Sequence, residues 1–391
     1  MATKRRTTIA DIAARAGVSI SAVSFALNDR PGVSDETRRR VREIAHELDW
    51  QPHTAARALG GAKAGSIGFV LNRPARTLGT ESFFGDLISG IQLGLAGTHV
   101  GMNLLVARDA EEELETYRDW WRGHRVDGVI VIDPRRDDAR LALLADLGMP
   151  TVVVGSHPSP DGAAPTVWID DSDATDTVLR YLHALGHRRI AHVAGRPEFE
   201  HTAMRMDRLR AFAADEGLDD TVSVPTDYSA EAGASATRTL LSRSVRPTAI
   251  VYDNDVLAVA GLGVASEMGV AVPGDVSIVS FDDSAMIRLV RPAITSLTRD
   301  TVELGQRAAT LLRAQIDASA PLPSRPGPSL TLSVRESTGR APRLTRSGRR
   351  RRRPAPAPAA AAPEARRGCL HLAYAPHCTA PTRDAVVFSV P

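Results

Sequence analysis

The stretch Ile9–Leu27, with the sequence IADIAARAGVSISAVSFAL, most constrains what this chain can fold into. Thr8 stands where a helix N-cap is expected, and Asp11 follows three residues later, so its carboxylate can reach back to the free amides of the first turn. Apolar residues recur at helical spacing at positions 9, 12, 13 and 16. Gly17 can adopt the left-handed conformation that ends a helix, and Ser19 can cap the next one. The stretch therefore predicts two short helices joined by a tight turn.

The second helix of this pair has an apolar inner face and a mixed outer face. Ala22, Val23 and Ala26 are expected to point inward, whereas the opposite face carries Ile20, Ser21, Ser24, Phe25 and Asn28. Two helices that cross at a glycine turn, one of them offering small residues outward, are typical of a helix-turn-helix DNA reader. On these residues alone, a helical hairpin with no DNA role remains the alternative, because such hairpins are common.

The residues that follow extend the pattern. A third helix is expected after Val33-Ser34, with Asp35 and Glu36 at its positive end and arginines further in. Trp50-Gln51-Pro52 and the AARAL segment come next. From IADIAARAGVSISAVSFALN through GVSDETRRRV to AARAL, over about sixty residues, the chain resembles the start of the LacI/GalR family of bacterial transcription regulators.

The resemblance implies that residues 1–50 form a DNA-binding domain and residues 51–61 a hinge segment. In that family the hinge becomes a short helix only on DNA, and a leucine matching Leu59 enters the minor groove at the operator centre. An alanine-rich segment this short cannot hold a helix alone in water. Phe25 stands where many relatives have arginine, so it can pack on thymine methyl groups but cannot donate hydrogen bonds to guanine. The implied DNA contacts are Thr8, Ser19, Ile20, Ser21, Ser24, Phe25, Asn28, Ser34, Thr37, His53, Ala56, Arg57 and Leu59.

From Gly65 onward, short apolar strands alternate with helical stretches. A first series runs SIGFVL, GMNLLVAR, VDGVIVID and PTVVVG, and a second runs TVWID, RIAHVAG, AIVYDND and VSIVSFDD. This alternation predicts an α/β fold with parallel sheets covered by helices on both faces. The resemblance implies a two-lobed core, as in periplasmic binding proteins, whose chain crosses between the lobes three times. We expect residues 62–165 with 297–325 in the first lobe, and residues 166–296 with 326–340 in the second.

Charge is distributed unevenly along the chain. Residues 341–391 hold ten arginines against Glu364 and Asp384, whereas residues 1–61 carry a net charge of +3 and the whole chain only +2. The core between these segments is therefore acidic, which suits a protein that presents its head to a polyanion. We interpret the basic, Pro/Ala-rich segment 341–391 as an added disordered tail. Its two cysteines and two histidines could in principle hold zinc, but such short tracts match by chance, and no metal is expected.

Other features limit the class of protein. No apolar run approaches the eighteen residues of a membrane span, and the charged start lacks the pattern of a secretion signal. Both cysteines lie in the last quarter of the chain, which gives no disulfide framework. The core shows no motif joining a nucleophile to a base and no glycine loop for phosphate. We therefore expect a cytoplasmic protein that is not an enzyme, has no cofactor and has no membrane partner.

Ligand contacts are expected at the carboxyl ends of strands, in the cleft between the lobes. The resemblance places seven residues where family members touch their effector: Phe83, Phe84, Arg205, Tyr228, Asn254, Asp282 and Arg299. Carboxylate and guanidinium groups can bracket vicinal hydroxyls, and aromatic faces can cover a sugar ring. Several of these assignments have an alternative: Asn254 and Asp282 as helix caps, one phenylalanine as plain core, and Arg205 as a surface ion pair.

Together these features predict a repressor that binds a palindromic double-stranded DNA operator as a homodimer. A small-molecule effector in the cleft, a sugar or a sugar derivative, would switch it. The alternatives are a nucleoside or purine effector, no effector at all, or a sugar-binding transport protein. The DNA-binding head and the missing secretion signal argue against the transport protein.

Overall fold

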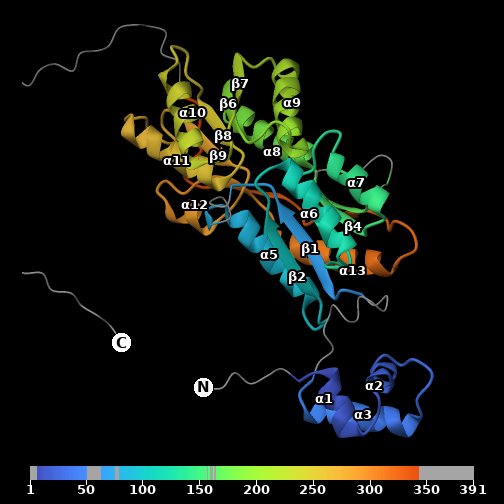
Figure 1. Ribbon diagram of the computed structural model, residues 1–391. Coiled ribbons are helices and arrows are strands. Elements are labelled where there is room, and N and C mark those ends of the chain that lie inside the picture. Colours follow the sequence, from blue (N-terminus) through green and yellow to red (C-terminus); the bar gives the residue numbers. More distant parts are fainter. Residues whose placement is uncertain are drawn as a thin grey trace, which may run out of the picture. The chain divides into compact units, whose positions relative to one another are not determined.

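The computed structural model of the protein describes residues 7–50, 63–74, 79–155, 157–158, 162 and 164–342 (Figure 1). The predicted hinge contacts His53, Ala56, Arg57 and Leu59 lie outside the described residues. The same holds for the predicted tail beyond Pro342.

The first part of the chain folds into three helices, as the sequence predicts. They are α1 (Ile9–Ala16), α2 (Ile20–Leu27) and α3 (Asp35–Glu47). The Thr8 amide donates a 2.8 Å hydrogen bond to the Asp11 carboxylate, while the Thr8 hydroxyl accepts from the Asp11 amide, so both halves of the capping box are present. Gly17 has a φ of 68°, the left-handed conformation that ends α1. The Ser19 and Ser34 hydroxyls cap α2 and α3.

Side chains from all three helices form one small core in this head. Its buried residues include Ile12 of α1, Val23 of α2 and Val41 of α3. Arg38 fastens α3 to the end of α2, because its guanidinium donates to the carbonyl oxygens of Phe25 at 3.3 Å and Arg30 at 2.9 Å. The same side chain also donates to the Ala26 carbonyl oxygen at 3.4 Å, so it links α3 to the last turn of α2 and to the turn that follows.

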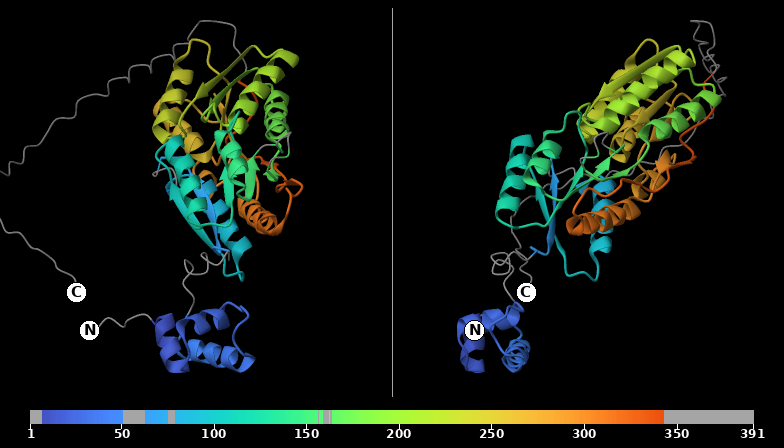
Figure 2. Two further views of the ribbon diagram at one scale, coloured as in Figure 1. Left: turned by 45° about the vertical axis from the view of Figure 1, so that its right-hand side comes forward. Right: turned by 90° about the vertical axis from the view of Figure 1, so that its right-hand side faces the viewer.

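The first lobe is built on a parallel sheet with strand order β11-β5-β4-β3-β1-β2. Helices cover both of its faces (Figure 2). One core contains side chains of α5 and α13, and another contains side chains of α6 and α7. The strands are β1 (Ser66–Leu71), β2 (Gly101–Val106), β3 (Val129–Ile132), β4 (Thr151–Gly155), β5 (Thr166–Trp168) and β11 (Arg325–Pro326). The helices are α5 (Ser82–Leu95), α6 (Ala110–Arg122), α7 (Ala139–Leu147) and α13 (Thr301–Asp317).

The second lobe repeats this design with strand order β12-β10-β9-β8-β6-β7, in which only β12 runs antiparallel to its neighbour. One core holds side chains of α8 and α9, and the other holds side chains of α10, α11 and α12. The strands are β6 (Arg189–Ala194), β7 (Asp220–Pro225), β8 (Ala249–Tyr252), β9 (Ser277–Ser280), β10 (Thr295–Thr298) and β12 (Thr331–Ser333). The helices are α8 (Asp171–Ala184), α9 (Glu200–Asp215), α10 (Ala230–Ser242), α11 (Asp255–Glu267) and α12 (Ala285–Leu289).

The chain crosses between the lobes three times, but each crossing lies a few residues from its predicted place. Strand β5, expected to begin the second lobe at residue 166, pairs in parallel with β4 of the first sheet. Strand β10 stays wholly in the second sheet, so the return crossing follows Thr298 instead of residue 296. Strand β11 pairs with β5, which places Pro326 in the first lobe rather than the second. Strands this short carry too little pattern to reveal which sheet they join.

Helix α9 begins at Glu200, so the predicted ligand residue Arg205 lies inside this helix. One further predicted boundary is corrected. The body of the protein also continues past residue 340, because the Ala341 amide donates to the Leu185 carbonyl oxygen at 2.9 Å.

Helix α13 is attached to α5 by contact between their backbones. A Cβ atom on Gly90 would lie 2.0 Å from the Val302 carbonyl oxygen, and one on Gly305 would lie 2.2 Å from the Leu87 carbonyl oxygen. This close approach holds the returning segment in the first lobe. None of the described helices alone is long and apolar enough to cross a membrane; α1 and α2 pass such a test only as a pair bent by 103°.

Candidate functional site

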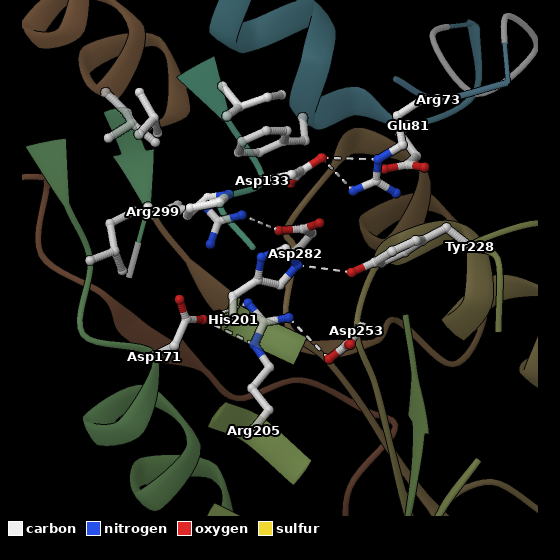
Figure 3. A pocket seen from close by; sticks show the side chains of 17 residues that line it. Arg73, Glu81, Asp133, Asp171, His201, Arg205, Tyr228, Asp253, Asp282 and Arg299 are labelled. Atoms are coloured by element: carbon white, nitrogen blue, oxygen red, sulfur yellow. Dashed lines mark hydrogen bonds and ion pairs between the residues drawn. The ribbon is translucent and has the colours of Figure 1, made fainter. Parts of the chain in front are cut away.

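A cavity of about 80 Å³ lies where the strand ends of the two lobes meet (Figure 3). Side chains that follow strands of both sheets line it. Arg73 follows β1 and Asp133 follows β3 in the first lobe, whereas Asp253 and Asp282 follow β8 and β9 in the second. This position matches the rule that open α/β sheets bind ligands beyond the carboxyl ends of their strands.

Arg205 is the buried cation of the second lobe. It is 5% exposed, and its Nη2 and Nη1 atoms donate to Asp171 at 2.6 Å and Asp253 at 3.0 Å. Asp253 also accepts from the Gly195 amide at 2.6 Å and pairs with His192 at 2.9 Å. Burial acts to raise the pKa of Asp253, but His192 and Arg205 outweigh it and hold the pKa well below its ordinary value. The alternative of a surface ion pair for Arg205 is therefore wrong.

Arg73 reaches from the first lobe to aromatic rings of the second. Its guanidinium donates to Asp133 at 3.0 Å and lies 4.6 Å from the centre of the Phe199 ring and 4.3 Å from that of Tyr228. A cation over an aromatic face is attracted by the ring quadrupole. The Ser82 hydroxyl adds a second bridge between the lobes, because it donates to Asp255 at 3.1 Å.

Tyr228 forms one wall of the cavity, and its position depends on a glycine. Its hydroxyl pairs with His201 at 2.9 Å and with Thr202 at 3.0 Å. A Cβ atom on Gly195 would lie 1.8 Å from the Tyr228 ring, so only glycine fits there. Burial, with a contribution from Arg205, lowers the pKa of His201, which favours its neutral form.

Glu81, Asp282 and Arg299 line the cavity with Phe83 beside them. Arg299 donates to Asp282 at 2.5 Å, and its guanidinium lies 5.1 Å from the centre of the Phe83 ring. Burial raises the pKa of Glu81 to about 8, although Arg73 acts in the opposite direction. Burial likewise raises the pKa of Asp282 to about 6 against the effect of Arg299.

Five of the seven predicted ligand residues line this cavity: Phe83, Arg205, Tyr228, Asp282 and Arg299. The other two do not. Phe84 is 1% exposed and belongs to the core of the first lobe, because consecutive residues on a helix point in different directions. Asn254 caps α11, where its Oδ1 accepts from the Leu257 amide at 2.9 Å, so the helix-cap alternative is correct for this residue.

Sequence reasoning missed several cavity residues. They are Arg73, Glu81, Asp133, Asp171, His201 and Asp253. A signal was present for four of them, because Arg73, Asp133, Asp171 and Asp253 stand just beyond apolar strands, where ligand contacts are expected. Glu81 and His201 had no such signal, since their place in the cavity depends on how the lobes meet.

The outer face of α2 is the candidate nucleic-acid interface. Ser19, Ile20, Ser21, Phe25 and Asn28 are exposed, whereas Ser24 is half-buried. Ile20 is 57% exposed and Phe25 36%, so this polar head presents two apolar side chains to solvent. The Phe25 ring also packs on the following turn, where a Cβ atom on Gly32 would lie 3.2 Å from it.

The remaining predicted contacts of the head serve partly as helix caps. Thr8, Ser19 and Ser34 each accept a hydrogen bond from the backbone of the helix that they begin. Thr37 is half-buried and its hydroxyl pairs with that of Ser34 at 2.9 Å. These side chains fix the starts of the three helices of the head.

Comparison with known proteins agrees with this architecture. Residues 8–53 match the model of bacterial regulatory proteins of the lacI family, and residues 179–338 match a periplasmic binding protein-like domain. The transcriptional regulator CelR of Thermobifida fusca is 30% identical over 341 residues, which cover 86% of this chain and 100% of that protein.

Two solved structures are also similar. A LacI family transcriptional regulator from Bifidobacterium animalis subsp. lactis is 34% identical with a TM-score of 0.65, over 72% of this chain and 100% of that one. A complex of CelR with cellobiose is 28% identical with a TM-score of 0.64, over 85% and 100%. Because head and core match together over the full length of such relatives, the chain belongs to the LacI family of bacterial regulatory proteins and is a DNA-binding transcriptional regulator with an effector-binding domain.

Proposed function

We propose that the protein is a repressor that binds a palindromic operator as a homodimer and is switched by a sugar or sugar derivative in the cleft. The observation that carries this proposal is the construction of the cavity from both lobes. Arg73 of the first lobe lies against Phe199 and Tyr228 of the second, so a ligand that enters between them must alter how the lobes meet. Such a change is a means of controlling the DNA-binding head.

The chemistry of the cavity supports a sugar. Carboxylates and guanidinium groups alternate around it, as the pairs Arg73–Asp133 and Arg299–Asp282 illustrate. Such groups bind hydroxyls through charge-assisted hydrogen bonds, while Phe83 and Tyr228 supply aromatic surface. The relative CelR was solved as a complex with cellobiose, which agrees with this class of ligand.

Exposed apolar side chains on the core support a homodimer. Leu93 of α5, Leu104 of the edge strand β2, and Met286 and Leu289 of α12 are exposed, and Leu289 is 76% exposed. Exposed apolar side chains that lie together mark interaction sites, and we propose that these four belong to the subunit interface. A single small head buries too little surface for tight specific binding, whereas two linked heads gain from their effective concentration.

For DNA recognition we propose that α2 enters the major groove with its exposed face. Ile20 and Phe25 would then read thymine methyl groups, and the serines of that face would bind phosphates or base edges. His53, Ala56, Arg57 and Leu59 of the hinge segment are proposed to reach the minor groove.

A gel-shift experiment on DNA from upstream of the protein's own gene tests this proposal. We expect a complex at a palindromic site, two protomers per site in sedimentation, and a changed affinity when a panel of sugars is added. A reporter under that site should be expressed more strongly when the protein is absent. Binding of one protomer to a half-site, or activation of the reporter by the protein, would contradict the proposal.

A further inference from the structure

Acidic side chains outnumber basic side chains around the cavity. Five carboxyl groups line it, from Glu81, Asp133, Asp171, Asp253 and Asp282, against three guanidinium groups. Each of these arginines already pairs with a carboxylate. Arg73 pairs with Asp133, Arg299 with Asp282, and Arg205 with both Asp171 and Asp253. Among the described residues that line the cavity, no cation is therefore left over for an anionic ligand.

Three residues that line the cavity also carry buried polar atoms without partners. Arg73 Nη1, Arg299 Nε and Glu81 Oε1 are buried and find no hydrogen-bond partner within the part of the chain that the structure describes. Two of these atoms are donors, and the third accepts or, when protonated, donates. A buried polar atom without a partner destabilises the structure, so a ligand that pairs with all three is favoured.

These observations concern the ligand of the proposed function and rest on that proposal. We infer that the cleft selects an uncharged polyhydroxy compound and rejects its phosphorylated form, with Glu81, Arg73 and Arg299 binding the hydroxyls. A hydroxyl donates and accepts at once, so it can accept from a guanidinium and donate to a carboxylate. A phosphate would place further negative charge beside carboxylates whose guanidinium partners are already engaged.

The protonation states of the carboxyl groups that line the cavity agree with this inference. Burial raises the pKa of Glu81 to about 8, so at neutral pH this side chain is mostly a neutral carboxylic acid. Even without the charge of Glu81, four carboxylates face three guanidinium groups. The negative potential against a phosphate therefore persists across the neutral range.

The experiment measures binding to the full-length protein by titration calorimetry, with matched pairs of probes. These are glucose and glucose 6-phosphate, ribose and ribose 5-phosphate, with cellobiose and inorganic phosphate added singly. We expect at least one free sugar to bind, and its phosphorylated form to bind weaker by about tenfold or more. A phosphorylated form that binds as tightly as its free sugar would overturn the inference but leave a sugar-derivative effector standing. Binding by none of the sugars in either form would overturn the proposed effector class together with the inference.

A variant that lacks one carboxylate tests the same inference, because it should bind the phosphorylated probe more tightly than the wild type does. Asp282→Asn removes one carboxylate and releases Arg299, so affinity for the phosphorylated probe should rise by about tenfold. Because burial already raises the pKa of Asp282 to about 6, the neutral amide should be tolerated by the fold. Asp176→Asn is the matched control, since Asp176 pairs with Arg208 and does not line the cavity. An equal effect of both variants would show that total charge, and not the cleft, sets the preference.

Discussion

At the scale of single residues, Glu81 connects the cleft to the pH dependence of stability. Its surroundings are Arg73, Asp282, Asp133 and Asp255, and burial is the main cause of its raised pKa of about 8. The folded protein therefore keeps a proton between pH 4.5 and 8 that the unfolded chain has lost, so the free energy of unfolding falls as pH rises through this window. One such proton contributes at most about 1.4 kcal/mol per pH unit.

The measurement is the thermal midpoint of unfolding between pH 6.5 and 8, compared with that of Glu81→Gln. The raised pKa of Asp282, about 6, and the lowered pKa of His201 leave both groups titrating below this range. We expect the wild-type midpoint to fall across the range and the midpoint of the variant to stay nearly level. If the thermal midpoints of the two proteins changed equally with pH, the pKa of Glu81 would not be raised in the folded protein.

Gly195 offers a second test at this scale. The Cβ atom of Gly195→Ala would meet the Tyr228 ring at 1.8 Å, so the ring must move out of its place in the cavity wall. We expect a loss of about 1–3 kcal/mol in the free energy of unfolding, the usual cost of overpacking, together with loss of ligand binding.

Gly263→Ala in α11 is the control, because nothing lies within 4 Å of its added atom. Since alanine favours a helix, this variant should be stabilised by about 0.5–1 kcal/mol. Equal effects in chemical denaturation would refute the steric argument.

At the scale of elements, the contact between α5 and α13 holds the returning segment of the chain in the first lobe. Gly305→Ala would place a Cβ atom 2.2 Å from the Leu87 carbonyl oxygen, which belongs to backbone and cannot turn aside. We expect the helices to separate and the free energy of unfolding to fall by about 3 kcal/mol, the upper part of the range for overpacked sites.

A urea titration of Gly305→Ala measures this loss, and Gly85→Ala on α5 is the control. Gly85 is helical, and nothing lies within 4 Å of its added atom. If Gly305→Ala unfolded at the same urea concentration as Gly85→Ala, the backbone contact between the two helices would not be a source of stability.

At the scale of the whole molecule, we predict that the charge of the segment beyond Pro342 is not required for specific recognition. Residues 343–391 contain ten arginines and two acidic residues. We expect their removal to weaken binding to random DNA and to reduce its salt dependence, because each arginine that meets a phosphate releases counterions. Affinity measured over a range of salt concentrations checks this. Loss of the preference for operator over random DNA on truncation would mean that the segment takes part in recognition.

A substitution at Leu59 should have the opposite effect to removal of that segment, because it should weaken binding to the operator and not binding to random DNA. If the hinge segment inserts this side chain into the minor groove, Leu59→Ala loses the bend in the DNA and the contacts that the bend permits. We expect operator affinity to fall by about 10²-fold, a few kcal/mol, while binding to random DNA, which depends on phosphates, stays the same. Competition assays at fixed salt compare the two DNAs. An equal loss on both would identify the segment as a plain linker.

The sequence by itself determined the elements and the order of the domains. The cap at Thr8, the left-handed Gly17 and the apolar strands were readable because each signal lies within about ten residues of the structure it controls. The same local signals, matched along the first sixty residues, indicated the family. Five of the seven residues that the family resemblance placed at the ligand site line the cavity.

Only the tertiary structure decided which sheet the short strands β5, β10 and β11 join and which charge pairs with which. Arg205 meets Asp171 and Asp253, which are 34 and 48 residues away, and Arg73 meets aromatic rings of the other lobe. Phe84 and Asn254 could not be separated from true cleft residues without knowing which way each side chain points. The physical reason is that caps and apolar periodicity depend on neighbours in sequence, whereas pairing, burial and the pKa values that follow from them depend on neighbours in space.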